Sequence, residues 1–384
     1  MQKRFTPDAG GVFPEWEEIE FGKLFQRRSE KNGEEFGVDK TISVATMHFK
    51  PEGNKAAEES LPKYRVLRKG DIAYEGNKSK HFKHGRFVLN DIGDGIISPI
   101  FEVLQPVSEL SKEVPEFWKY YINYEPVMGK ILAKCANTGI MMNRLAIKDF
   151  YKQKIKVPCI VEQRKIAAAL AAYDEMIAVK TAKLETWQEC KKRMVKEIFG
   201  RTKRFKDDDG REFPEWEEKT LGTIVSITTG KLNANEMVDG GQFDFYTSGV
   251  DVFKIDKAAF NGPAITVAGN GANVGCLHLA DGKFNAYQRT YVLQDFLACR
   301  EYIYAAIEVK LPNVIKKYKR GSAIPYIVMD MLADLKIPLP CMEEQQKIGS
   351  FLAEIDKEIK IEKEFVKTYA EGKKKMMREL MEVK

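Results

Sequence analysis

The sequence predicts an α+β protein, in which two β-rich domains of mixed α/β structure are separated by a pair of long helices. Three observations predict this fold: a hexapeptide that occurs twice, a closing segment that occurs twice, and a long proline-free stretch after each closing segment. The chain has 384 residues, of which 44% are hydrophobic and 31% charged. This composition is typical of a globular protein, and the length allows two or three domains.

The hexapeptide marks the start of each half. Phe-Pro-Glu-Trp-Glu-Glu occurs at residues 13–18 and again, unchanged, at residues 213–218. Six identical residues that include a tryptophan indicate an internal repeat. A strand-like stretch with a shared glycine follows each copy, with Gly22 in residues 20–25 and Gly222 in residues 220–225. Both halves therefore begin in the same way.

The halves also end alike. Residues 155–159 and 337–341 both end in cysteine and lead into Glu-Gln-x-Lys-Ile, at 162–166 and 344–348. Between these marks the halves diverge, with strand-like runs at 96–104 and 287–293 and glycine turns such as 269–275. Gly200 is predicted to end the first helix, and residues 201–210 to form a polar link. The predicted boundaries are 1–158 and 201–340 for the two domains, and 159–200 and 341–384 for the two helices.

Each closing segment precedes a predicted helix, since apolar residues recur at alternating spacings of four and three. The narrow apolar stripe favours a helix pair over the alternative, a core helix of a larger α/β domain. At about 1.5 Å per residue, each helix would be on the order of 60 Å long. If Ile166 lies opposite Leu380, Lys180 and Glu362 flank the midpoint and attract each other. The predicted seam consists of Ile166, Leu170, Tyr173, Ile177, Leu184, Trp187, Met194, Ile348, Leu352, Ile355, Ile359, Val366, Tyr369 and Met376.

The ends of the two helices are rich in lysine and arginine but also carry apolar residues. One partner helix could not cover all of them, so we expect an exposed strip that binds another subunit. Trp16 and Trp216 are expected to be core residues rather than contact residues. The apolar residues of this expected strip are Met194, Phe199, Met376, Met377 and Met381.

The composition limits where the chain acts. No stretch approaches the roughly 20 apolar residues of a membrane span, and the first residues lack the apolar segment of a secretion signal. The six cysteines lie far apart with no Cys-x-x-Cys, which argues against disulfides and a thiolate zinc site. We therefore expect a cytoplasmic protein. The net charge of +6 is only mildly basic, so charge alone is weak support for nucleic-acid binding.

The duplicated arrangement resembles the DNA-specificity subunit of a Type I restriction-modification system. The hexapeptide carries this resemblance together with Gly-x-x-Ser-Pro-x-Phe-x-Val-Leu at 95–104 and the Pro-Cys-x-x-Glu-Gln-x-Lys-Ile helix starts. Lys-Lys-x-Met-x-x-Glu at 191–197 and 373–379 adds to it. The resemblance implies that each variable region is a target recognition domain, which reads one part of a bipartite target in double-stranded DNA, and that the two long helices pack antiparallel as a coiled-coil spacer.

The resemblance also implies partners. They are two methyltransferase subunits, which use S-adenosylmethionine to methylate adenine, and a restriction subunit that translocates and cleaves DNA, with ATP and magnesium expected there. This chain would be non-catalytic and would bind none of these cofactors.

Two alternatives remain: a self-contained DNA-modifying enzyme, and a coiled-coil scaffold that does not bind DNA. Against the enzyme, the chain lacks an Asn-Pro-Pro-Tyr-like tetrad and a phosphate-binding Gly-x-x-x-x-Gly-Lys loop. The glycines of 269–275 fit a turn between strands better than a cofactor loop. His81 and His84 lack a third ligand nearby, so a basic loop is favoured over a metal site. The scaffold would have no salt-sensitive affinity for DNA.

Two basic clusters without acidic residues, at 76–90 and 309–321, are the candidate phosphate contacts. Arginine, asparagine, glutamine and lysine are candidates for reading base edges, because they make bidentate hydrogen bonds in the major groove, and Asn77, Asn143 and Gln288 are further candidates of this kind. The predicted DNA-binding residues are Lys78, Lys80, Lys83, Arg86, Arg144, Asn270, Asn273, Arg289, Lys316, Lys317, Lys319 and Arg320.

Overall fold

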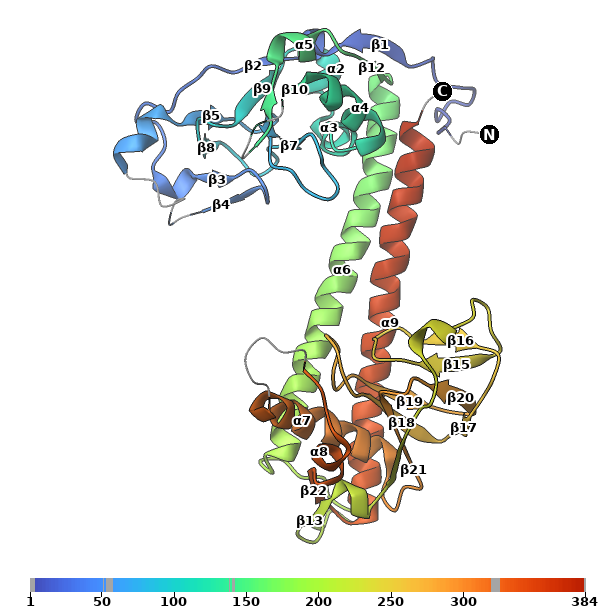
Figure 1. Cartoon of the computed structure of the whole chain (residues 1–384). Coiled ribbons are helices and arrows are strands. Elements are labelled where there is room, and N and C mark those ends of the chain that lie inside the picture. The colour runs from blue at the N-terminus through green and yellow to red at the C-terminus, as the bar shows by residue number, and fades with distance from the viewer. Residues whose placement is uncertain are drawn as a thin grey trace. The chain divides into compact units, whose positions relative to one another are not determined.

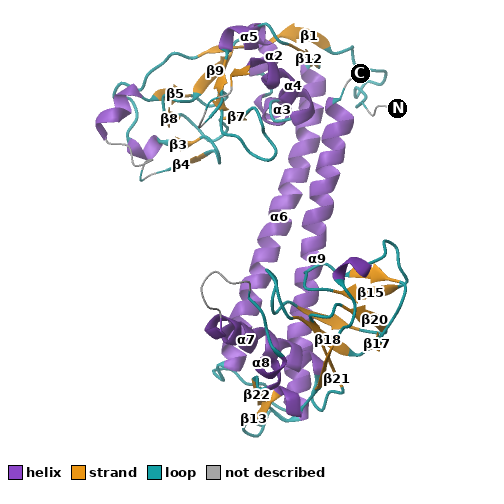
Figure 2. Cartoon of the chain, in the orientation of Figure 1, coloured by secondary structure: helices purple, strands orange, loops and turns teal. Residues whose placement is uncertain are grey.

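The computed structural model describes residues 4–50, 52, 58–137, 139, 142–318 and 325–382. The chain forms two compact units (Figure 1). The first combines Met1–Val179 with Phe365–Lys384, and the second is Lys180–Glu364. Each unit therefore contains one sheet-rich domain and a part of both long helices (Figure 2).

The first unit is built on a four-stranded antiparallel sheet in the order β2 (Phe25–Arg27), β9 (Glu102–Pro106), β6 (Ile72–Glu75), β7 (Arg86–Leu89). The smaller pairs are β1 (Glu17–Glu20) with β12 (Lys154–Val157), β3 (Ile42–Ser43) with β4 (His48–Phe49), β5 (Arg65–Leu67) with β8 (Gly95–Ile97), and β10 (Ala136–Asn137) with β11 (Arg144–Leu145). The short helices are α1 (Phe21–Leu24), α2 (Glu109–Lys112), α3 (Pro115–Tyr121), α4 (Glu125–Cys135) and α5 (Ile147–Tyr151), and 3-10 turns occur at Val38–Lys40 and Glu58–Lys63.

Aromatic side chains fill the core of this unit. Phe25 of β2 meets Trp118 of α3 edge to face, with ring centroids 5.0 Å apart, and Phe21 and Phe87 both contact the ring of Phe150. The same buried cluster includes Ile166, Ala167 and Leu170 at the start of one long helix, and Leu380 and Met381 at the end of the other. The helix ends are thus part of the core of the domain.

The second unit repeats this plan with different residues. Its main sheet is antiparallel in the order β14 (Ser226–Thr229), β21 (Thr290–Gln294), β18 (Ala264–Ala268), β19 (Leu277–Ala280). A second sheet has the order β16 (Phe253–Ile255), β15 (Phe243–Tyr246), β20 (Lys283–Ala286), β17 (Phe260–Asn261). The remaining elements are β13 (Glu217–Thr220) paired with β22 (Lys336–Leu339), helices α7 (Arg300–Tyr318) and α8 (Met329–Ala333), and 3-10 turns at Leu221–Thr223 and Ala234–Glu236.

The long helices α6 (Ile160–Phe199) and α9 (Met342–Met381) run antiparallel in both units, as the fold class predicts (Figure 1). The seam residues near the helix ends are buried: Ile166, Leu170, Met194, Ile348, Leu352, Ile355 and Ile359. The other seam residues are half-buried: Tyr173, Ile177, Leu184, Trp187, Val366, Tyr369 and Met376.

The attraction predicted between Lys180 and Glu362 is an ion pair in the structure. Lys180 Nζ lies 3.2 Å from Glu362 Oε2, and Lys183 Nζ lies 2.7 Å from Glu362 Oε1. Glu362 is 1% exposed. The hydrogen bond from Lys183 is the main reason why the pKa of Glu362 lies below its usual value, and Lys180 adds to it. One carboxylate therefore receives two cations of the facing helix within the second unit.

Several local expectations were wrong. Gly22 and Gly222 lie in single helical turns, while the strands are the acidic stretches β1 and β13 just before them. A side chain at either glycine would crowd a neighbour, since an added Cβ would lie 3.1 Å from the Cβ of Tyr151 or Ala333. The run 96–104 is not one strand, because it breaks around Pro99 between β8 and β9. Residues 287–289 precede β21, whereas 269–275 is the turn between strands that the sequence predicts.

The expected exposed strip at the helix ends was also wrong in part. Met194 and Met381 are buried, at 8% and 2% exposure, and Phe199, Met376 and Met377 are packed against the cores. The sheet-rich domains cover these residues, which a helix pair considered alone would leave in solvent. Trp16 and Trp216 are buried in the two cores.

Candidate nucleic-acid interface

The repeated sequence segments meet at the start of each long helix and fix the domain to it. In the first unit, Glu162 of α6 is buried and accepts hydrogen bonds from two side chains. Trp16 Nε1 donates to Glu162 Oε2 at 3.1 Å, and Arg4 donates to both carboxylate oxygens, at 3.0 and 2.7 Å. The bond to Glu162 raises the pKa of Arg4. A buried carboxylate is tolerated because it is paired with a cation and fully hydrogen-bonded.

The second unit repeats this anchor residue by residue. Trp216 Nε1 donates to Glu344 Oε2 at 2.9 Å, and Arg204 donates to the same oxygen at 2.8 Å. The guanidinium also donates to the carbonyl of Pro214 at 2.6 Å, the same distance that joins Arg4 to the carbonyl of Pro14. We call these two sets the Arg–Glu–Trp anchors: Arg4, Glu162 and Trp16, and Arg204, Glu344 and Trp216.

The anchors show that the predicted polar link at 201–210 belongs to the second domain. Arg204 is paired with Glu344, and Phe205 packs against Phe351 of α9 with ring centroids 5.7 Å apart. The sequence held a signal for this, because Lys-Arg-Phe occurs at 3–5 and 203–205, at the same spacing as the hexapeptide. The repeat is therefore longer than the hexapeptide.

In the first domain, two loops with basic residues lie side by side. The loop between β6 and β7 contains Lys78, Lys80 and Lys83, which are exposed. The backbone N–H of Asn143 donates to the carbonyl of Gly76 at 2.8 Å, and its side-chain amide donates to the carbonyl of Lys83 at 3.1 Å. Arg144, next to Asn143, is exposed as well. The fold thus brings the first basic cluster and Arg144 to one surface.

Gly76 has to be glycine for this arrangement. An added Cβ would lie 2.0 Å from the carbonyl oxygen of Asn143, a distance that no side chain tolerates. Close approach of the two loops therefore depends on this residue.

Arg86, also predicted to bind DNA, is engaged within the domain. Arg86 Nε donates to Glu75 Oε2 at 2.7 Å, Nη2 donates to the carbonyl of Ala45 at 2.6 Å, and the guanidinium lies over the ring of Phe82. Glu75 is buried. The basic cluster was defined in the sequence as the run after Gly76 without acidic residues, so it did not include Glu75, one residue earlier. The register of β6 and β7 places Glu75 opposite Arg86.

In the second domain, polar side chains from four segments line one cavity of about 180 Å³. Ser248 donates to Asn270 Oδ1 at 2.7 Å, which orients the side-chain amide of Asn270. Gln288 and Arg289, just before β21, are exposed, and Tyr326 at the rim is 62% exposed. Arg289 and Asn270 are therefore brought together, although they are far apart in the sequence. Tyr326 was missed, because one tyrosine after a proline carries no pattern.

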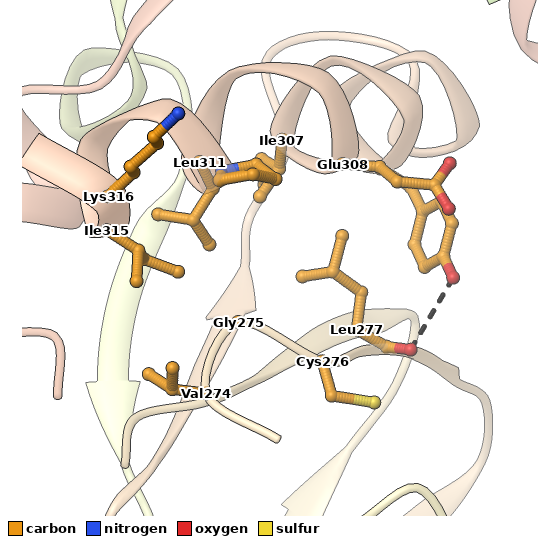
Figure 3. A pocket seen from close by; sticks show the side chains of 11 residues that line it. Val274, Gly275, Cys276, Leu277, Ile307, Glu308, Leu311, Ile315 and Lys316 are labelled. Atoms are coloured by element: carbon orange, nitrogen blue, oxygen red, sulfur yellow. Dashed lines mark hydrogen bonds between the residues drawn. The ribbon is translucent and has the colours of Figure 1, made fainter. Parts of the chain in front are cut away.

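The second basic cluster is not in this cavity. Lys316, near the end of α7, lines a separate groove of about 530 Å³ between α7 and the start of β19. Figure 3 shows Lys316 and Glu308 at opposite ends of it, with Leu311 between them and Ile315 beside Lys316. Asn273 and Lys317 are exposed, in the β18–β19 turn and at the end of α7. The other two predicted members, Lys319 and Arg320, lie outside the described residues.

The corresponding place in the first domain, between α4 and the start of β7, is nearly filled. There Phe82, Met128 and Leu132 leave a cavity of about 10 Å³. The two domains thus share a plan but differ in the surface that they expose beside it.

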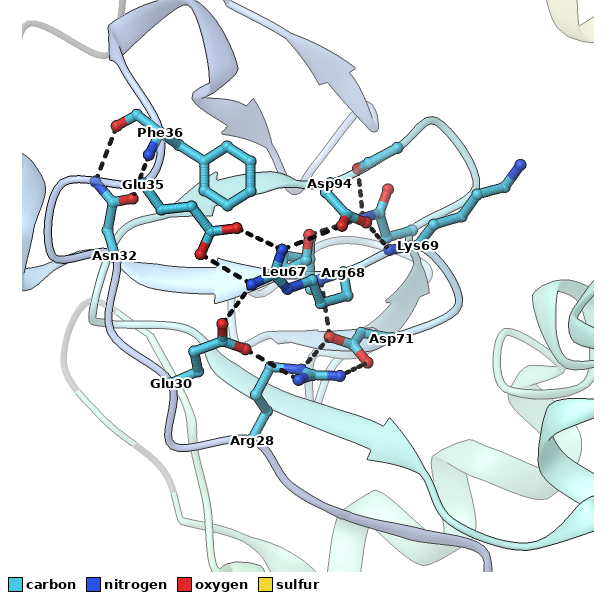
Figure 4. Close-up of polar contacts among 12 residues, drawn as sticks. Arg28, Glu30, Asn32, Glu35, Phe36, Leu67, Arg68, Lys69, Asp71 and Asp94 are labelled. Carbon is cyan, nitrogen blue, oxygen red and sulfur yellow. Dashed lines mark hydrogen bonds and ion pairs between the residues drawn. The ribbon is translucent and has the colours of Figure 1, made fainter.

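Other arginines of the first domain are neutralised by carboxylates (Figure 4). Arg68 pairs with Glu30, Glu35 and Asp94, and Arg28 pairs with Asp71 and Glu30. Burial raises the pKa of Asp71 despite its bond to Arg28. A backbone bond from Lys69 and the contact with Arg68 lower the pKa of Asp94. This network joins the segment after β2 to the turn between β5 and β6. The guanidinium groups of Arg28 and Arg68 are therefore already paired with carboxylates.

The histidines give no metal site in the part of the chain that the structure describes. His81 and His84 lie in the β6–β7 loop, and no group of three possible ligands gathers among the described residues. No helix within those residues is long and apolar enough to cross a membrane.

Comparisons with known proteins agree with this arrangement. Residues 214–367 match the family model described as a Type I restriction modification DNA specificity domain. The chain is 35% identical over 146 residues to the EcoDI specificity subunit of a Type I restriction enzyme from Escherichia coli, a match that covers 37% of this chain and 32% of that subunit. The chain thus spans about a third of the length of this relative.

Two further matches cover more of the chain. It is 24% identical over 325 residues to the MjaVIII specificity subunit of a Type I restriction enzyme from Methanocaldococcus jannaschii, covering 75% of this chain and 73% of that subunit. The crystal structure of the S subunit of a Type I restriction-modification system from M. genitalium covers 99% of this chain and all of that one, with a TM-score of 0.71 and 16% identity. The latter shows the fold. Together these matches confirm the resemblance inferred from the sequence.

Proposed function

Because this chain is a relative of the specificity subunits of Type I restriction-modification systems, we propose that it reads DNA sequence for such a complex. Each domain recognises one part of a bipartite target, and the chain directs adenine methylation or cleavage by its partners. The chain itself does no chemistry. The observation that carries the proposal is the duplication: two domains of one plan, each fixed by an Arg–Glu–Trp anchor, each presenting exposed basic or amide side chains on adjoining loops.

The catalytic groups would be on other subunits. We expect two methyltransferase subunits with S-adenosylmethionine, and a restriction subunit with ATP and magnesium, to assemble with this chain in the cytoplasm. The fold offers these partners repeated surfaces, because two homologous domains and two homologous helices present similar features twice.

Deleting the chain from its host should abolish methylation at a bipartite DNA motif. The methyltransferase subunits would then lack the part that selects the target. Mapping methylated adenines across the genome, with and without the chain, measures this. A scaffold without DNA contact, or an independent enzyme elsewhere in the host, would leave the methylated motif in place.

Replacing Lys78, Lys80 and Lys83 by alanine should weaken DNA binding without changing the motif. Each phosphate contact contributes about 0.9 to the slope of log K against log salt, so the slope should fall by about 2 to 3. Binding titrations between low and moderate salt give the slope. The control replaces Lys23, Lys63 and Lys112, exposed lysines of the same unit away from these loops. An unchanged slope would contradict the phosphate assignment.

A further inference from the structure

Two arginines of the domains differ from the other domain arginines in their side-chain contacts. Outside the two long helices, the described arginine side chains form ion pairs or ring contacts, except those of Arg144 and Arg289. The engaged ones are Arg4, Arg27, Arg28, Arg65, Arg68, Arg86, Arg201, Arg204, Arg211 and Arg300. Arg144 and Arg289 are exposed, and none of their side-chain donors is bonded to a described residue. Five donors in a rigid fork are thus available on each.

Both arginines lie beside the same backbone position of the repeated fold. Gly76 follows β6 and Gly269 follows β18, the corresponding strands of the two main sheets. The carbonyl of Gly76 accepts from the N–H of Asn143, the neighbour of Arg144. The carbonyl of Gly269 accepts from the N–H of Ile327, and its N–H donates to the carbonyl of Arg289. Each domain therefore holds, beside this glycine, one guanidinium that has no partner among the described residues.

In both domains, the residues around the exposed arginine are suited to DNA binding. Arg144 adjoins the loop of Lys78, Lys80 and Lys83, whose charges can neutralise phosphates. Arg289 lines the 180 Å³ cavity with Asn270, whose amide is oriented by Ser248. Phosphate contacts position a protein on the duplex, while an unpaired arginine can reach a base edge. The bidentate partner of arginine in the major groove is the O6 and N7 pair of guanine.

We propose that Arg144 and Arg289 are the guanine-reading, specificity-determining residues of this chain, a proposal that rests on the proposed function. Arg144 reads a guanine in the part of the target bound by the first domain, and Arg289 reads one in the part bound by the second. The carboxylates that occupy Arg68, Arg28 and Arg86 keep those arginines from this role.

The test is a map of methylated adenines in cells that express the whole complex with Arg144→Ala or Arg289→Ala. Each variant should relax one G·C position in one part of the motif and leave the other part intact. Discrimination at that position should fall roughly ten-fold or more, the usual worth of a bidentate contact. Arg289→Lys keeps the charge without the fork, so it should relax the same position.

Arg211→Ala is the matched control, because Arg211 is exposed and forms an ion pair with Asp209, and it should leave the motif unchanged. A motif that is unchanged in both test variants, or a uniform weakening at all sites, overturns the assignment. These results differ from failure of the proposed function, in which deleting the whole chain would leave the methylated sites as they were. Both positions are exposed, and equal melting temperatures of the variants and the unchanged chain verify folding.

Discussion

Replacing Glu344 by alanine should lower the free energy of unfolding of the second unit by about 3 kcal/mol. Glu344 is 0% exposed and accepts from both Arg204 and Trp216. Removing it leaves a partly buried guanidinium and a buried indole N–H without their acceptor, which costs more than the pair contributes. Glu162→Ala should act in the same way on the first unit, where Arg4 and Trp16 lose their acceptor.

Urea unfolding and hydrogen exchange at β13 and β22 would measure the effect of Glu344→Ala. β13 begins with the last two residues of the hexapeptide, and its partner β22 precedes α9, so the protection of both strands depends on the anchor. Glu215→Ala is the matched control, because Glu215 contacts the same Arg204 but its side chain is 86% exposed. We expect the control to change the free energy of unfolding by at most about 0.5 kcal/mol. Equal effects of the two variants would refute a structural role for the buried carboxylate.

Residues 1–200 alone should dimerise weakly and change the DNA target from asymmetric to palindromic. The two helices carry matching seams, so the first helix can pair with a second copy of itself, and an antiparallel pair of identical helices has twofold symmetry. Two copies of the first domain would then read inverted repeats. The self-pair is weak because the place of Glu362 is taken by Lys180 of the second copy, which faces Lys180 and Lys183.

Lys180→Glu should strengthen this fragment dimer. The carboxylate introduced in each copy would meet Lys183 of the other copy, which reproduces the contact of 2.7 Å between Lys183 and Glu362 twice. The repulsion between Lys180 and Lys183 is removed as well, while the two introduced carboxylates repel each other as the two Lys180 side chains did, so the dissociation constant should fall about ten-fold. Analytical ultracentrifugation of the fragment and the variant measures it. Lys192→Glu, an exposed change on the same helix, is the control, and a variant that stays monomeric wherever the fragment does would refute the seam.

In the whole chain, Lys180→Glu should act in the opposite direction. The new carboxylate would lie beside Glu362, whose pKa is held low by Lys183 and Lys180. A carboxyl group with a lowered folded-state pKa contributes stability above its unfolded pKa, and loses it as the pH falls through the folded value. The variant should therefore be destabilised most at neutral pH and least in acid. A pH series of melting temperatures distinguishes this from a general loss of folding.

The candidate DNA-binding surface could be predicted only in part. Lys78, Lys80 and Lys83 are in a loop that adjoins Arg144 at the start of β11, but Arg86 is occupied by Glu75 and Lys316 lines another groove. Counting charged residues along the sequence identifies basic clusters of exposed lysines, because these side chains need no partner from another segment. It cannot find which arginine has a carboxylate across a strand, because that partner comes from the register of the sheet.

The duplication, the two long helices and the charged residues at their midpoint could be predicted from the sequence alone, whereas the antiparallel direction of the helices came from the family resemblance. These features repeat at fixed spacing, and helix periodicity depends on local geometry alone. The role of the repeated residues is seen only in the tertiary structure. Arg4 and Trp16 are far from Glu162 in the sequence, yet both donate hydrogen bonds to its carboxylate. The tertiary structure also decided that Met194 and Met381 are core residues, and that Arg144 and Arg289 are without partners among the described residues while other domain arginines have them. Burial and pairing depend on which distant segments the fold brings together, and no local pattern records that.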